Sequence, residues 1–263
     1  MLRHSVKIVY DAHEIYPAMV AGKIPHILYT LVRWVDKIFI RVADCVIIPS
    51  EERKIFYTYA RRLIVVPNTP KFTEIREEPK EGEFSIFYGG ELSRENGILI
   101  MIKAIIGIPH VKLTLAGDGP LRRVIERICK KNNNLKYLGL INQKDVLKNL
   151  ARADVTFVFY EPTNINNMYP ASNKLFEAMM VGVPVIANRE TSLSKIIEKY
   201  KCGILVPYGD VQILKNELIK LKRNPLLRKT LGENGKKAFK ENFAWDLIEK
   251  RFINCYQEML YRN

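Results

Sequence analysis

The sequence has few cysteines, no long apolar run and no excess of acidic residues. Its four cysteines are widely separated and form no C-x-x-C pair, which argues against a structural zinc site or a disulfide framework and favours a reducing compartment. No apolar run reaches the roughly 18 residues of a membrane-spanning helix. Residues 1–5 do not have the pattern of a signal peptide. We therefore expect a globular protein located in the cytoplasm.

Basic residues are what the chain has in excess. Among 263 residues, 42 lysines and arginines stand against 28 aspartates and glutamates, which gives a net charge of +14. Such an excess favours a polyanionic partner: nucleic acid, an anionic membrane surface or a phosphorylated substrate. Because the basic residues are spread along the chain without a recognition-helix or stacking-aromatic signature, a nucleic-acid-binding protein is only a minor alternative.

Short apolar runs alternate with helical patterns along most of the chain. The runs predict strands at residues 6–10, 44–49, 63–67, 84–88, 111–116, 135–138, 155–159, 183–187 and 203–207. The other patterns predict helices at residues 24–43, 97–106, 121–131, 193–200, 210–223 and 245–260, with shorter or less bounded helices after Ser50 and after Asn224. This alternation predicts an α/β fold with parallel sheets. The charged segment 71–83 is predicted to be a linker.

The stretch 170–187 is predicted to fold as loop, helix, stop and strand. Ser172 and Asn173 are good N-cap residues, because a short side-chain oxygen can bond the free amides of the first helical turn. Gly182 suits a left-handed helix stop, and Pro184 prevents the helix from resuming. The apolar residues that follow are typical of a strand buried on both faces.

Two charged residues mark this helix as a candidate binding element. A helix N-terminus attracts phosphate through its free amides and its dipole, and Lys174 in the first turn is unfavourable unless an anion binds there. Glu177, one turn further on, could accept hydrogen bonds from the paired hydroxyls of a ribose. The alternative is that Glu177 is a partly exposed structural residue, and the residues alone leave both interpretations open.

His13 and three glycines follow predicted strands. Ligands of open parallel sheets bind beyond the carboxyl ends of the strands, where His13, Gly90, Gly117 and Gly119 are placed. Glycine allows a backbone to approach a phosphate or sugar closely. The alternatives are a structural His13–Glu14 pair and ordinary turns at the glycines.

The predicted helix at 24–43 is basic and amphipathic. Arg33, Lys37 and Arg41 follow one another at four-residue steps and form one basic stripe. Trp34 and Phe39 lie off the apolar face that is expected to contact the core. This combination favours contact with an anionic membrane surface, and a solvated helix face is the alternative.

Several segments together resemble the family 4 glycosyltransferases, the glycosyl transferases group 1, which have the GT-B fold of two facing Rossmann-like domains. The segments that carry the resemblance are 11–14, 43–50, 65–69, 116–122, 138–141 and 170–187. The resemblance implies a partial N-terminal acceptor-side domain at 1–70, a linker at 71–83 and a donor-binding domain at 84–241. It further implies a helix at 242–263 that crosses back to the N-terminal domain. The N-terminal domain is then incomplete, because the family has further βα units before the first strand.

The resemblance also implies roles for particular residues. Glu177 would hold the ribose of a nucleotide-diphosphate sugar, and the backbone near Leu140 would contact the base. Gly90, Gly117 and Gly119 would let the backbone approach the donor.

The diphosphate would bind at the helix N-terminus, at Ser172, Asn173 and Lys174, with Arg94 as a further cation. His13 would lie beside the transferred sugar. The nucleotide sugar is a substrate, and neither a cofactor nor a metal is implied.

Three positions depart from the family pattern. Tyr169 stands where the family often has a glutamate that contacts the donor sugar. Glu91 and Asn96 stand where the family often has an arginine and a lysine that neutralise the leaving diphosphate. Asn173 to Glu177 resembles a subset of the family that lacks the first glutamate.

The implied activity is transfer of a sugar, with retention of configuration, to a lipid-linked or glycan acceptor at the cytoplasmic face of a membrane. The main alternative is a non-catalytic sugar-nucleotide-binding subunit or truncated paralogue. Such a chain would work with a partner chain that supplies the missing N-terminal half. A sugar-nucleotide epimerase is a minor alternative.

Overall fold

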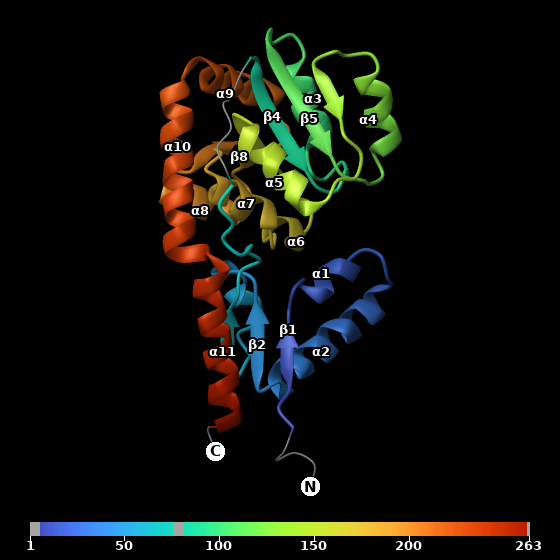
Figure 1. Ribbon diagram of the computed structural model, residues 1–263. Helices are drawn as coiled ribbons and strands as arrows, with labels where there is room; N and C mark the ends of the chain where they lie inside the picture. The colour runs from blue at the N-terminus through green and yellow to red at the C-terminus, as the bar shows by residue number, and fades with distance from the viewer. Residues whose placement is uncertain (1–5, 76–81, 262–263) are drawn as a thin grey trace.

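The computed structural model describes residues 6–75 and 82–261, which form two α/β units connected by α11 and by the segment after β3 (Figure 1). The N-terminal unit contains β1 (Val9–Asp11), α1 (Tyr16–Val20), α2 (His26–Val42), β2 (Cys45–Ile48), the 3-10 helix η2 (Glu51–Phe56) and β3 (Leu63–Val65). The C-terminal unit contains β4 (Phe84–Gly89), α3 (Ile98–Ile105), β5 (Val111–Ala116), α4 (Arg122–Cys129), β6 (Leu135–Tyr137), α5 (Gln143–Arg152), β7 (Val155–Val158), α6 (Ile165–Met168), α7 (Asn173–Val181), β8 (Val185–Asn188), α8 (Leu193–Tyr200), β9 (Gly203–Val206), α9 (Val211–Arg223) and α10 (Pro225–Ala238). The π-helical turn η3 (Phe239–Phe243) and α11 (Trp245–Tyr261) follow.

The N-terminal unit is built on a three-stranded parallel sheet in the order β1-β2-β3. The central strand β2 is fully buried, and β1 is an edge strand. Strand pairing begins at Val9 and not at Val6, because the Ile8 amide donates to the Asp44 carboxylate at 2.9 Å. The predicted strand at 6–10 is therefore shorter than expected and continues to Asp11.

The C-terminal unit is a six-stranded parallel sheet in the order β6-β5-β4-β7-β8-β9. Helices α3, α4 and α9 bury their apolar side chains on one face, and α5, α7 and α8 bury theirs on the other, while α10 contributes Leu231 to the first cluster and Ala238 to the second. The chain moves outward from β4 in one direction and from β7 in the other, so the strand order reverses between these two strands. The α/β class with parallel sheets is confirmed, and this reversal is where such sheets bind ligands.

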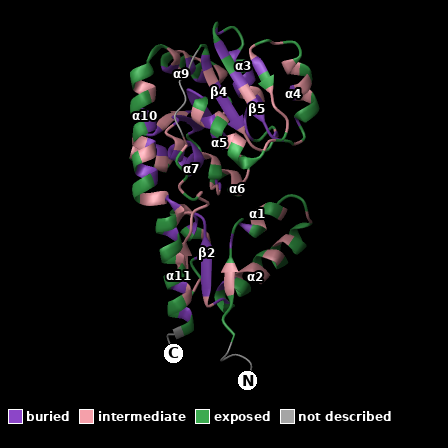
Figure 2. Ribbon diagram, viewed as in Figure 1, coloured by how far each residue is buried: buried purple, intermediate pink, exposed green. Residues whose placement is uncertain are grey.

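Helix α11 extends away from the C-terminal unit and lies along the N-terminal sheet (Figure 1). Its Cys255 and Met259 pack against Cys45 of β2, with Val9 and Ile64 beside them. Figure 2 shows β2 and the central strands β4 and β5 as largely buried, whereas β1 is only partly buried and much of α2 is exposed. No helix within the described residues combines the length and the apolarity needed to cross a bilayer.

Helices α1, α5 and α6 were not predicted from the sequence. Helix α5 begins after Asn142, whose side-chain oxygen accepts a hydrogen bond from the Asp145 amide at 2.9 Å. Helix α6 begins in the same way after Asn164, which caps the Asn167 amide at 2.9 Å. Each asparagine is a helix-start signal that the apolar pattern alone does not carry. The predicted linker at 71–83 lies partly outside the described residues.

Candidate functional site

A cavity of about 400 Å³ opens at the carboxyl ends of the central strands of the C-terminal sheet. We call it the donor crevice, after the role that the family resemblance implies for this unit. Its lining is Gly89, Gly90, Glu91, Ala116, Gly117, Asp118, Leu140, Ile141, Gln143, Val146, Asn173, Lys174 and Glu177. All of these residues belong to the C-terminal unit. Six of the predicted site residues are brought together here: Gly90, Gly117, Leu140, Asn173, Lys174 and Glu177.

Glu177 is a buried carboxylate on the second turn of α7, with 8% of its surface exposed. The side-chain amide of Gln143 donates a hydrogen bond to its Oε1 at 2.8 Å. Burial raises the pKa of the Glu177 carboxyl, and the hydrogen bond and the Lys174 charge oppose this with smaller effects. A buried charge with a single protein partner is expensive unless a ligand completes its hydrogen bonds. Gln143 is a site residue that the sequence did not reveal, because α5 was not predicted.

Lys174 lies in the first turn of α7, and its Nζ is held between two tyrosine rings. Nζ is 5.3 Å from the ring centroid of Tyr88 and 5.0 Å from that of Tyr160. Tyr88 is the last residue but one of β4 and Tyr160 follows β7, so the ammonium group lies at the point where the strand order reverses. The two rings attract the cation without neutralising it. Lys174 can therefore still receive an anion in the crevice.

The predicted helix start and stop at α7 are observed. Ser172 is the residue before the helix, and Gly182 ends it with a φ of 78°, in the left-handed region that favours glycine. The Ser172 side chain makes no capping hydrogen bond, and its buried Oγ has no partner among the described residues. Ser172 does not line the donor crevice.

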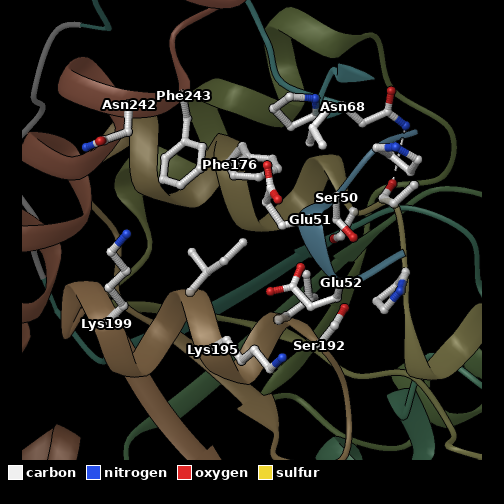
Figure 3. A pocket seen from close by; sticks show the side chains of 18 of the residues that line it. Ser50, Glu51, Glu52, Asn68, Phe176, Ser192, Lys195, Lys199, Asn242 and Phe243 are labelled. Atoms are coloured by element: carbon white, nitrogen blue, oxygen red, sulfur yellow. Dashed lines mark hydrogen bonds between the residues drawn. The ribbon is translucent and has the colours of Figure 1, made fainter. Parts of the chain in front are cut away.

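Ser172 instead lines a second cavity, of about 320 Å³, between the two units (Figure 3). Figure 3 shows side chains of both units around it, including Glu51 and Glu52 of η2 and Lys195 of α8. Phe176 and Phe243 form part of its apolar wall. Ser172 therefore directly precedes Asn173 and Lys174 in the sequence, but it lines a different cavity from them.

Gly117 and Gly119, after β5, allow their loop to pack closely against the loop that follows β4. A Cβ at Gly117 would lie 1.9 Å from the Gly90 carbonyl oxygen, and one at Gly119 would lie 2.8 Å from the Leu92 amide nitrogen. Both glycines have positive φ. Glycine is required at both positions because the backbone of the neighbouring loop lies where a side chain would be. Gly119 lies outside the lining of the donor crevice.

His13 and Arg94 also lie outside the donor crevice. The His13 side chain is exposed and lines a groove of about 630 Å³ between the end of β1 and α2. The groove is lined by Tyr10, Asp11, His13, Glu14, Tyr16, Leu31, Val32, Val35, Asp36 and Phe39. We call it the acceptor groove, because the family resemblance implies that this unit is on the acceptor side. Arg94 is exposed, and its carbonyl accepts a hydrogen bond from the Tyr208 hydroxyl at 3.3 Å.

Two of the three departures from the family pattern have structural roles. Asn96 is buried, and its side-chain amide donates to the Glu91 carbonyl at 3.1 Å and to the Ser93 hydroxyl at 2.8 Å. The Tyr169 ring packs edge-on against Phe56 of η2, with centroids 5.1 Å apart. Glu91 alone of the three lines the donor crevice.

With this geometry established, comparison with known proteins decides the family. The sequence profile described as glycosyl transferases group 1 matches residues 71–238, which include the whole donor crevice. The chain belongs to this family. An uncharacterized glycosyltransferase of Methanocaldococcus jannaschii is 31% identical to this group 1 chain over 200 residues, covering 75% of the chain and 54% of that protein.

Characterised relatives of the group 1 chain are more distant. A GDP-mannose-dependent monoacylated alpha-(1-6)-phosphatidylinositol monomannoside mannosyltransferase of Corynebacterium glutamicum is 26% identical, with 61% of this chain and 42% of that protein covered. The chain spans about half the length of the curated relatives that it matches.

Solved structures confirm the GT-B fold of the group 1 chain. Sucrose-phosphate synthase from Thermosynechococcus elongatus superposes with a TM-score of 0.79 at 21% identity, covering 97% of this chain and 68% of that one. The Anabaena protein HepE in complex with UDP-glucose superposes with a TM-score of 0.75 at 19% identity, covering 96% and 72%. Both units are therefore matched, at identities that establish the fold alone.

Proposed function

We propose that this polypeptide transfers a sugar from a nucleotide-diphosphate donor, bound in the donor crevice, to a lipid-linked or glycan acceptor. The observation that carries the proposal is that Lys174 and Glu177, from successive turns of α7, line one cavity at the reversal of the strand order. A cation and a hydrogen-bonded buried carboxylate, one helical turn apart, suit a diphosphate and a ribose diol.

Each part of the donor has a group to receive it. The Glu177 carboxylate, oriented by Gln143, accepts hydrogen bonds from the ribose hydroxyls. The free amides of Asn173 and the following residue, with the Lys174 ammonium group, receive the diphosphate. The exposed backbone at Leu140 contacts the base.

In the reaction, the bond between the anomeric carbon and the diphosphate oxygen breaks, and the electron pair stays on the diphosphate. The acceptor hydroxyl oxygen bonds to the anomeric carbon on the same face, and its proton passes to the departing diphosphate oxygen. The α7 dipole and Lys174 stabilise the developing negative charge. Arg94 serves as a second cation and His13 lies beside the sugar when donor and acceptor are both bound.

The acceptor groove supports binding of an amphipathic or polyhydroxyl molecule. It combines apolar side chains of α2, such as Leu31 and Phe39, with the carboxylates of Asp11 and Glu14. Its volume of about 630 Å³ lies in the range of small-molecule sites, which is roughly 300–1,000 Å³. The mannosyltransferase of C. glutamicum, named for a phosphatidylinositol acceptor, supports a lipid-linked acceptor for this chain.

The outer face of α2 supports a location at the cytoplasmic surface of a membrane. Trp34, on the same side of α2 as the basic residues, is 60% exposed. Lys37 and Arg41 lie over the Tyr59 ring, with Lys37 Nζ 5.4 Å and Arg41 Cζ 4.6 Å from its centroid, and this holds both cations on one side of the helix. Aromatic and basic groups side by side suit an anionic bilayer surface.

A second candidate function is a sugar-nucleotide-binding subunit that works with a partner chain. Glu91 favours it, because a carboxylate that lines the donor crevice repels the leaving diphosphate. The partner chain would add further βα units at the edge strand β1.

Calorimetric titration with UDP, GDP and their sugar conjugates tests the proposal. We expect saturable binding that is lost in Glu177→Ala and kept in Glu233→Ala, which removes an exposed glutamate of α10 as a matched control. Turnover of the bound donor with an acceptor separates the transferase from the binding subunit. Absence of nucleotide binding in the unmodified protein would overturn both functions.

A further inference from the structure

Arg53 is the largest fully buried polar side chain among the described residues, and neither the family resemblance nor the donor crevice accounts for it. It belongs to η2 in the N-terminal unit, yet its guanidinium group reaches the C-terminal unit. Nε and Nη2 donate to the Tyr169 carbonyl at 2.8 and 2.6 Å. Nη1 donates to the His13 carbonyl at 2.7 Å, and Nη2 lies 3.5 Å from a Glu14 carboxylate oxygen.

These contacts join two segments on which the proposed function depends. The Tyr169 carbonyl directly precedes Pro170, in the short segment that leads into α7 and its Lys174 and Glu177. The His13 carbonyl belongs to the loop that follows β1 and borders the acceptor groove. One guanidinium group therefore holds the acceptor-side loop and the entrance to the donor helix in fixed relation.

Two neighbouring contacts hold the same segments. Asn166 of α6 exchanges two hydrogen bonds with Ile15: the Ile15 amide donates to its Oδ1 at 2.9 Å, and its Nδ2 donates to the Ile15 carbonyl at 3.3 Å. The Phe56 ring packs edge-on against the Tyr169 ring. Figure 1 shows the setting, with α1 of the lower unit facing α6 of the upper unit. The loop at His13 is thus fixed on both sides, and Arg53, which belongs to neither segment, donates hydrogen bonds to both.

Burying an arginine is unfavourable, because its guanidinium group loses its hydration. Removing its charge from water costs several kcal/mol, which well-packed apolar side chains would avoid. What arginine offers is a planar fork whose donors point in fixed directions and can bind two carbonyls simultaneously. Lysine would carry the same charge but, as a flexible point charge, would not hold both carbonyls in fixed geometry.

We propose that Arg53 is a positioning residue that sets the acceptor-side loop of His13 against the entrance to the donor helix α7. The proposal rests on the proposed function for its catalytic consequence. Displacement of reacting groups by about 1 Å can cost about 100-fold in rate. Because no residue of the donor crevice belongs to the N-terminal unit, loss of the fork should leave nucleotide affinity intact.

The test compares Arg53→Lys with Arg62→Lys in the full chain. Arg62 is a matched control, since it also connects the N-terminal unit to a distant element, through its ion pair with Glu258 of α11. Hydrogen–deuterium exchange should accelerate at least tenfold at residues 12–16 and 165–171 in Arg53→Lys and stay unchanged there in Arg62→Lys. Unchanged exchange in both segments would overturn the proposal.

Kinetics supply the second readout. In Arg53→Lys we expect kcat to fall about 100-fold, while the nucleotide Kd and the donor KM stay within about twofold of the unmodified protein. A purely structural role would weaken nucleotide binding and kcat together, and that result would overturn the proposal, as would an unchanged kcat. If the unmodified protein binds no nucleotide, the proposed function fails, and the exchange experiment still decides whether Arg53 fixes the two segments.

Discussion

The two units differ in how far their sheets are covered by helices of the same unit. The six-stranded sheet of the C-terminal unit is covered by helices on both faces, and its donor crevice is lined by that unit alone. The three-stranded sheet of the N-terminal unit has a small core, takes part of its cover from α11 and leaves much of α2 exposed. One unit therefore contains the whole lining of the proposed donor site, whereas the other depends on neighbours for part of its cover and, in the role proposed for Arg53, for its position.

The largest expected effect contrasts one aromatic residue from each unit. Phe157 of β7 is fully buried and stacks on Tyr88 with centroids 4.8 Å apart, so Phe157→Ala should lower the free energy of unfolding by about 3–5 kcal/mol. Phe39→Ala on α2 removes a side chain that is 59% exposed and should change it by less than about 0.5 kcal/mol. Urea denaturation followed by circular dichroism measures both. Equal losses would show that the face of α2 is covered in solution.

The sequence was sufficient to predict the parts of the fold that depend on local signals. Buried apolar runs predict the strands, and the helix start before Asn173 and the stop at Gly182 define α7 without any tertiary information. The donor residues Lys174 and Glu177 lie on this one short helix, so the pattern that predicts the helix also places them together.

The parts that could not be predicted depend on contacts between distant segments. Gln143 lies 34 residues before Glu177 in the sequence, and the two side chains form a hydrogen bond because α5 packs beside α7. Arg53, in a charged run, has the sequence appearance of a surface residue, and only carbonyls 116 and 40 positions away make it a buried one. A buried polar group is defined by its partners, and those partners do not show in the local sequence pattern.

The second prediction separates the two charged groups of the donor crevice. Lys174→Ala should weaken the binding of a nucleoside diphosphate by about 1.5–3 kcal/mol, the usual contribution of a hydrogen bond to a charged group. It should leave the affinity for the nucleoside, which has no phosphate, almost unchanged. Glu177→Ala should lower the affinity for both ligands, because it removes the proposed ribose contact. Titration calorimetry with UDP and uridine, or with the guanosine pair, measures the four affinities.

If Lys174→Ala lowered the affinity for the nucleoside as much as the affinity for the nucleoside diphosphate, the assignment of Lys174 to the phosphate would be wrong. Lys195→Ala is the matched control, because Lys195 lines the cavity between the units and not the donor crevice.

The third prediction concerns pH. Burial raises the folded-state pKa of Glu177 above that of the unfolded chain, so the folded protein binds more protons between the two values. The stability that the protonated carboxyl contributes is present at low pH and is lost as the pH rises through the folded-state pKa. Nucleotide affinity has the opposite dependence, because the ribose hydroxyls require the carboxylate. Affinity should fall as the pH is lowered from neutral toward the ordinary glutamate pKa of about 4.3.

Below the folded-state pKa of Glu177 the fall should approach tenfold per pH unit, at about 1.4 kcal/mol per unit. Glu177→Gln, which cannot ionise, should bind more weakly and lose this part of the pH dependence. A fall of the same steepness in Glu177→Gln would assign the titration to another group.

The smallest expected effect tests how α11 is held on the N-terminal unit. Arg62 pairs with Glu258 of α11, but 31% and 47% of the two side chains are exposed. Exposed pairs contribute about 0–1 kcal/mol, so Arg62→Ala should lower the unfolding free energy by less than about 1 kcal/mol. Arg61→Ala, at the neighbouring exposed arginine, is the control. A loss above about 2 kcal/mol in Arg62→Ala alone would mean that the ion pair, and not the apolar contact of Cys255 and Met259, attaches α11 to the smaller sheet.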